Sequence, residues 1–143
     1  MKYKEILSEV LHIYNVSLKN NKGLETVKQL IKALCDFYDS AITEYLQHFK
    51  KNGKIKEIPE APIKRLELFE NLFISEDIKN ILEDYKTLRF CINSEIITKD
   101  EYRRSMKIIC KSLDKTIEIN QKKLKDFVET AKKFSQIIEK QIG

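Results

Sequence analysis

Eleven apolar residues spread over about the last forty positions lie on one side of a helical wheel. At 100° per residue they stay within roughly 60° of one direction from Tyr102 to Ile142, with no change of phase. Eight basic residues of the same segment fall within roughly 40° of the opposite direction. Because both faces agree, the pattern predicts one nearly continuous helix over residues 99–141, opened by a capping box of Thr98 and Glu101.

One stretch of this segment leaves an alternative open. Residues 114–120 contain Thr116, Ile117 and Ile119, whose β-branched side chains weaken a helix. Asn120 can cap a new helix with its side chain. A kink within residues 114–120 is therefore the main structural alternative to a continuous helix.

The rest of the chain also favours helices, because the whole sequence holds only three glycines and two prolines. Apolar residues at steps of three and four predict further helices over residues 3–18, 24–51, 62–73 and 75–93. Asn52 and Gly53 suit a left-handed cap at the end of the second. Pro62 suits the first turn of the third, and Ser75 suits the cap of the fourth.

These elements predict an all-α fold: a single bundle of about five helices in one domain, residues 1–143, with an irregular linker at about 52–61. We expect one core, made of Leu30, Leu34, Tyr38, Ile42, Leu82, Tyr85, Ile109 and Leu113. Three unpaired-looking cysteines, Cys35, Cys91 and Cys110, lie in or beside apolar stripes and are predicted to be core thiols in a reducing compartment.

The sequence indicates a cytoplasmic protein. Its first ten residues include Lys2, Lys4, Glu5 and Glu9, so they lack the apolar region of a signal peptide. No stretch approaches the roughly 18 apolar residues that a membrane span needs. We therefore expect no membrane partner.

The net charge belongs to one part of the chain. Residues 1–98 hold 15 basic and 15 acidic residues, whereas residues 99–143 hold 12 and 7, so the second part carries the whole formal charge of +5. A basic stripe there can follow nucleic-acid phosphates, although interspersed acids favour an ordinary solvated face. The candidate nucleic-acid contacts are Arg103, Arg104, Lys107 and Lys111.

No pattern indicates catalysis, a metal or a cofactor. Glu9 and His12 have the spacing of one di-iron ligand pair, but His48 lies four residues from Glu44 rather than three, so the second pair is missing. Three isolated glycines cannot form a phosphate-binding loop. We expect no catalytic residue, no metal site and no cofactor, and the sequence favours a protein that is not an enzyme.

Two segments resemble the helical hairpin of HEPN-type domains: residues 84–89 (DYKTLR) on one predicted helix and residues 98–104 (TKDEYRR) opening the next. The resemblance covers residues 24–113. It implies a bundle of helices that tends to dimerise, in a family that includes metal-independent ribonucleases and companions of minimal nucleotidyltransferases. Ribonuclease members carry an Arg followed closely by a His, whereas here Arg65 is the first arginine and follows both histidines. The resemblance thus implies a member without the nuclease motif.

The function that the sequence favours is a non-enzymatic helical interaction module that forms a homodimer or binds a protein partner. A helix over residues 99–141 would be about 64 Å long, longer than the roughly 40 Å diameter of a domain of this size. Its overhanging part would expose an apolar seam, the predicted interface: Leu124, Phe127, Ala131, Phe134, Ile138 and Ile142. Alternatively, the N-terminal helix folds back and covers this seam. The alternative function is a HEPN-like nucleic-acid- or nucleotide-binding domain that uses the basic stripe.

Overall fold

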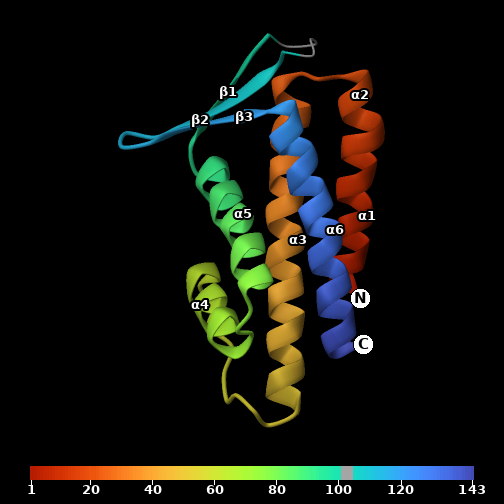
Figure 1. The fold of residues 1–143 in the computed structure, drawn as a ribbon, viewed down its shortest axis with the longest axis vertical. Coiled ribbons are helices and arrows are strands. Elements are labelled where there is room, and N and C mark those ends of the chain that lie inside the picture. The colour runs from red at the N-terminus through yellow and green to blue at the C-terminus, as the bar shows by residue number, and fades with distance from the viewer. Residues whose placement is uncertain (101–104) are drawn as a thin grey trace.

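The fold is a helical bundle with a small antiparallel sheet across one end (Figure 1). It is described from a computed structural model, which covers residues 1–100 and 105–143. The expected helices thus account for most of the chain, but the all-α prediction is wrong in detail because the described part also contains three strands. In the same part, no helix has the long apolar stretch that crossing a bilayer requires.

The N-terminal rod and the long helix after it match their predicted ranges. The rod consists of α1 (Lys2–His12), a π-helical turn η1 (Ile13–Ser17) and α2 (Leu18–Asn20). Asn21 then accepts a hydrogen bond from the backbone N–H of Gly23 through its side chain, 3.0 Å away. The next helix, α3 (Leu24–Lys51), runs the length of the molecule and contacts α1, α4, α5 and α6.

Two shorter helices pack on one side of α3. Helix α4 (Pro62–Leu72) starts with proline in its first turn, as expected, after the irregular segment that follows α3. Helix α5 (Glu76–Ile92) follows Ser75, whose backbone is extended but whose side chain makes no capping hydrogen bond. Glu76 and Asp77 instead place negative charge at the positive end of the α5 dipole.

The sheet has the order β1–β2–β3, with strands β1 (Glu95–Lys99), β2 (Lys107–Lys111) and β3 (Thr116–Asn120). Ile96 lies opposite Cys110, and Ile108 lies opposite Ile119, all facing the helices. A tight turn closes the β2–β3 hairpin, in which the Ser112 N–H donates to the Lys115 carbonyl at 2.8 Å. Figure 1 shows this hairpin projecting sideways from the bundle.

The continuous helix expected over residues 99–141 is wrong. Residues 107–111 and 116–120 form strands, and in the described part of this range only α6 (Gln121–Ile142) is helical. Side-chain burial alternates along β1 and β3, whereas β2 has three buried residues in a row, Ile108, Ile109 and Cys110. The β-branched Ile and Thr side chains of these strands fit a pleated surface. The predicted cap at Asn120 is confirmed: its side chain accepts a hydrogen bond from the Lys123 N–H at 2.8 Å. The chain therefore starts a new helix there, after an interruption larger than a kink.

The predicted capping box also fails. Thr98 lies within β1, and no helix begins there in the described residues. Glu101, its predicted partner, lies outside the described residues.

Helix α6 lies against α3, with α1 on one side and α5 on the other (Figure 1). Its apolar stripe is buried within the chain: Leu124, Phe127, Ala131, Phe134 and Ile138 are almost fully covered, and Ile142 is half-buried. The prediction that this seam overhangs the domain is therefore wrong. The alternative is the arrangement observed, because α1 folds back onto α6 and places Val10 in the same core.

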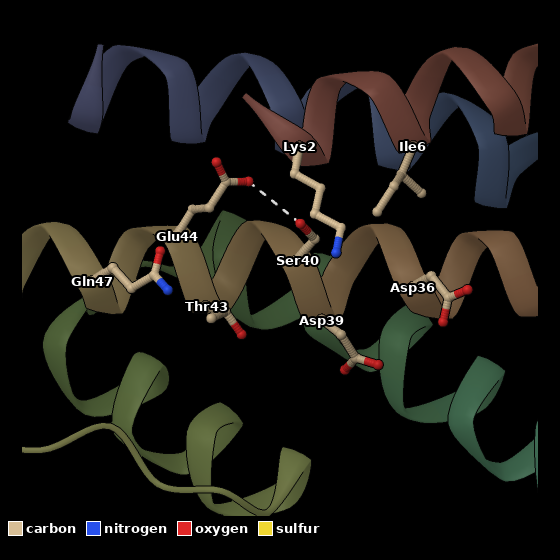
Figure 2. A pocket seen from close by; sticks show the side chains of 8 residues that line it. All are labelled: Lys2, Ile6, Asp36, Asp39, Ser40, Thr43, Glu44 and Gln47. Carbon is tan, nitrogen blue, oxygen red and sulfur yellow. Dashed lines mark hydrogen bonds between the residues drawn. The ribbon is translucent and has the colours of Figure 1, made fainter.

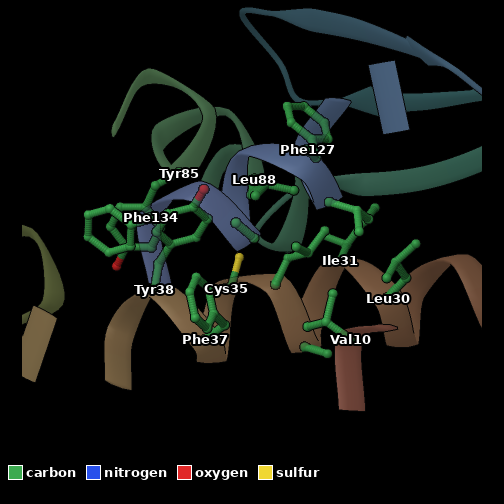
Figure 3. Close-up of a cluster of buried hydrophobic side chains, with 14 of the residues drawn as sticks. Val10, Leu30, Ile31, Cys35, Phe37, Tyr38, Tyr85, Leu88, Phe127 and Phe134 are labelled. Atoms are coloured by element: carbon green, nitrogen blue, oxygen red, sulfur yellow. The ribbon is translucent and has the colours of Figure 1, made fainter. Parts of the chain in front are cut away.

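The aromatic centre of the core lies where α3, α5 and α6 meet (Figure 3). The ring of Phe134 is 5.1 Å from Tyr38, 5.8 Å from Phe69 and 6.2 Å from Phe37 between centroids. Such edge and tilted pairs add to the free energy gained by burial.

Most of the predicted core is confirmed, with two corrections in the sheet. Leu30, Leu34, Tyr38, Ile42, Leu82 and Tyr85 are buried in one cluster. Ile109 is covered but lies outside this cluster, on the outer face of β2. Leu113 is fully exposed in the β2–β3 turn.

We expect Phe134→Ala to lower the free energy of unfolding by about 3 to 5 kcal/mol, because the cavity would open among three aromatic rings that belong to α3 and α4. Chemical denaturation followed by circular dichroism measures this loss. Ile74→Ala is the control: Ile74 is 89% exposed, so its truncation should change stability by no more than about 0.5 kcal/mol. Equal effects of the two variants would contradict the packing described.

Candidate functional site

Lysines from four separate segments meet at the end of the bundle that carries the sheet. Lys99 lies opposite Lys107 in the β1–β2 register, and Lys107 lies opposite Asn120, two residues before Lys122. Lys19 and Lys22 line one pocket with Met106 and Gln121, the neighbours of Lys107 and Lys122. We call this set the basic end: Lys19, Lys22, Lys99, Lys107 and Lys122.

The pocket at the basic end is small and has an apolar floor. Its volume is about 140 Å³, and Leu18, Met106 and Leu124, all buried, form its floor, with Tyr14 beside them. Tyr14 belongs to the π-helical turn, which changes the direction of side chains relative to an α-helix. The pocket is too small for a sizeable ligand, but it holds the two N-terminal lysines beside the start of α6.

The start of α6 adds positive potential to the basic end. Backbone N–H groups give the first turn of a helix a partial positive charge, which acidic side chains normally offset. This first turn has no acidic residue and instead carries Lys122 and Lys123. Of these two lysines, only Lys123 has a salt-bridge partner among the described residues: its Nζ lies 3.4 Å from the Asp84 carboxylate. The charge arrangement therefore opposes helix stability at this point and favours an anion nearby.

A second unfavourable charge arrangement lies in the sheet beside it. Lys99 and Lys107 are direct cross-strand neighbours, and like charges at this spacing repel. Asp100 follows Lys99 with a positive φ of 55°, a backbone conformation that few non-glycine residues adopt. Its carboxylate accepts a hydrogen bond from the Ser105 hydroxyl at 3.4 Å. Asp100 is thus tied to its own loop near the two lysines.

The predicted nucleic-acid contacts are only partly brought together. Lys107 and Lys111 are both exposed on the outer face of β2, but they stand at opposite ends of the strand, and Lys111 lies opposite Glu95. Arg103 and Arg104 lie outside the described residues. Four lysines of the basic end were not among the predicted contacts: Lys19, Lys22, Lys99 and Lys122. Lys19 and Lys22 belong to a part of the chain whose charges balance, so no local signal indicated them.

A second polar region is a groove along α3, beside α1 (Figure 2). Its volume is about 520 Å³, and Lys2 of α1 extends over it toward Ser40. Glu44 accepts hydrogen bonds from the Tyr3 N–H at 2.9 Å and from the Ser40 hydroxyl at 3.3 Å. Because Tyr3 lies in the first turn of α1, the Glu44 carboxylate caps that helix from a distant position in the sequence.

The other carboxylates of the groove are also used within the fold. Asp39 accepts hydrogen bonds from the Tyr85 hydroxyl and, at 3.4 Å, from the Arg89 guanidinium. Burial, followed by this hydrogen bond, raises the pKa of Tyr85. Asp36 pairs with Lys32 at 2.9 Å. These contacts join α3 to α5 and α1, so the groove is explained by stability rather than by catalysis.

The histidines and cysteines form no reactive cluster in the described residues. No group of three or more His, Cys, Asp or Glu there could hold a metal ion, and His48 lies 3.1 Å from the Asn52 amide. All three cysteines are buried free thiols, as predicted. Burial raises the pKa of Cys35 to about 12. A hydrogen bond with the Cys110 thiol, followed by burial, raises the pKa of Cys91. Because the thiolate is the nucleophile, Cys35 and Cys91 are poor nucleophiles.

Comparisons with known proteins assign no family. No family model, no curated protein and no solved structure matches this chain. The candidate site therefore depends on its own geometry.

We expect stability to fall as pH rises above about 8.5, where an unfolded thiol loses its proton. The folded chain keeps the Cys35 proton up to about pH 12, so the unfolded state binds fewer protons and the free energy of unfolding decreases with pH. Urea titrations between pH 7 and 10.5 measure the slope. Cys35→Ala should make it shallower by up to about 1.4 kcal/mol per pH unit, and an unchanged slope in that variant would refute the assignment.

Proposed function

We propose that the protein is a non-enzymatic module that binds nucleic acid through its phosphates at the basic end. The proposal rests on the numbers of basic and acidic residues in the described segments that meet there. Residues 18–23, 99–100, 105–107 and 120–123 hold six lysines, and their single acidic residue is Asp100. This concentration of charge lies across separate elements, beside the positive end of the α6 dipole.

The kind of recognition follows from the side chains available. Lysines act as point charges and bind phosphates without reading bases. None of the large hydrophobic residues exposed in the described part of the chain is aromatic, so stacking on bases has little support there. Binding should therefore depend strongly on salt and weakly on sequence, because phosphate contacts release counterions.

The electrostatic arrangement supports the same proposal. The Lys99–Lys107 neighbours and the lysines at the start of α6 each oppose folding. A bound phosphate backbone would reverse the sign of both effects, since it supplies negative charge to both places at once. Violations of local rules that gather at one place are typical of functional surfaces.

The HEPN-like resemblance stays a hypothesis about ancestry. Residues 84–89 lie on α5, as the resemblance implies, whereas residues 98–99 end a strand. Nucleic-acid binding at the basic end does not require that ancestry. Self-association, the other function that the sequence favoured, needs a surface other than the buried stripe of α6.

The test compares two triple variants of equal net charge. Lys19, Lys107 and Lys122 are exposed at the basic end and are changed together to Gln, while Lys50, Lys51 and Lys56, exposed near the other end of α3, are changed to Gln as the control. Fluorescence anisotropy with a mixed-sequence oligonucleotide, single-stranded and then duplex, gives affinity against salt.

We expect the basic-end variant to reduce the magnitude of the log–log salt slope by about two to three, near 0.9 for each lost phosphate contact. The control variant should keep the slope of the unmodified protein. Absence of binding at physiological salt, or equal losses in both variants, would show that the basic end is an ordinary solvated surface. Far-UV circular dichroism of each variant confirms that it remains folded.

A further inference from the structure

The sheet has two edges, and no strand in residues 1–100 or 105–143 pairs with the outer edge of β1. Exposed strand edges pair readily with other strands, so natural proteins cover them, charge them or use them. The inner face of β1 packs on α3 and α5, which fixes the strand in place. The outer edge of β1 is therefore a rigid, preformed surface.

The sequence of β1 is complementary to itself in one antiparallel register. Reading from Glu95 to Lys99, the strand is Glu-Ile-Ile-Thr-Lys, with Ile97 at its centre. If two copies pair about a two-fold axis at Ile97, Glu95 of each lies opposite Lys99 of the other. We propose that β1 pairs in this register with β1 of a second copy of this chain, giving a symmetric dimer with a continuous six-stranded sheet.

The residues around β1 favour a second copy of the chain as its pairing partner. Ile97 is 40% exposed on the outer face of the sheet, and the two-fold axis would bring it against Ile97 of the second copy. Lys99 already has an unfavourable neighbour in Lys107. The Glu95 carboxylate of a second copy would lie on the other side of Lys99 and offset that repulsion.

The other edge of the sheet provides the comparison. β3 reads Thr-Ile-Glu-Ile-Asn, so the same symmetric pairing would place Glu118 against itself. Like charges directly opposite each other oppose pairing. The charge pattern thus selects the β1 edge and disfavours the β3 edge.

The expected dimer is small and reversible. Two five-residue strands bury less than the roughly 1,600 Å² of a standard interface, so we expect dissociation constants between about 1 μM and 1 mM. The Glu95–Lys99 pairs are exposed and set the register more than the affinity. Association should therefore depend on concentration, which sedimentation and light scattering can follow.

The test reverses one charge at a time. Lys99→Glu places Glu against Glu at both ends of the pairing and should weaken dimerisation at least about tenfold. It also removes the Lys99–Lys107 repulsion, so the variant should be at least as stable as the unmodified chain. Loss of the dimer in this variant therefore cannot be attributed to unfolding. Glu118→Lys on the opposite edge is the control and should still dimerise.

Three further samples examine the register. Glu95→Lys alone should be monomeric, but mixed with the Lys99→Glu variant it should form a heterodimer, because each strand then carries one sign of charge. The double variant Glu95→Lys with Lys99→Glu should dimerise again. A monomeric unmodified chain at about 1 mM, or a Lys99→Glu variant that dimerises as before, would overturn the proposal. These measurements need no nucleic acid, so they test dimerisation independently of binding at the basic end.

Discussion

Burial of α3 is the constraint on which the rest of the fold depends. This 28-residue helix has thirteen buried residues, spread over most of its circumference, so no single neighbouring helix could cover it. Helices α1, α4, α5 and α6 each cover part of it, and Phe134 of α6 fills the centre against Phe37 and Tyr38. The remaining exposed strip of α3 is polar, and its carboxylates tie α1 and α5 in place.

The same constraint places the sheet and the basic end. Because α2 ends, and α3 and α6 both start, at one end of the bundle, the α2–α3 connection and the first turn of α6 bring lysines to the same place (Figure 1). Strands β1 and β2 add Lys99 and Lys107 there. The sheet spans the gap between the last turn of α5 and the first turn of α6. Its inner face completes the core with Ile96, Ile108, Cys110 and Ile119.

Helical parts of this fold could be predicted because their patterns are long and local. The stripe of α3, the proline of α4 and the Asn120 cap are all visible in the sequence. Strands β2 and β3 were hidden because Ile109, Leu113 and Ile117 also fit a helical period, and five-residue strands give too few positions to decide. The basic end depends on segments about 80 residues or more apart, such as Lys19 and Lys99, and the Glu44 cap of α1 depends on a contact over 41 residues. Only tertiary structure reveals such pairs.

The π-helical turn in the N-terminal rod has a consequence for how this chain can change in length. Leu18 follows Ile13 by five positions, and its N–H bonds to the Ile13 carbonyl, so the turn holds one residue more than an α-helical turn. Both side chains still face the core, while Val16 between them is 45% exposed. Deletion of one residue here would restore the four-residue spacing and leave Leu18 in register. A homologue one residue shorter at this point would thus keep the same core, whereas a deletion inside α3 would rotate every buried side chain beyond it.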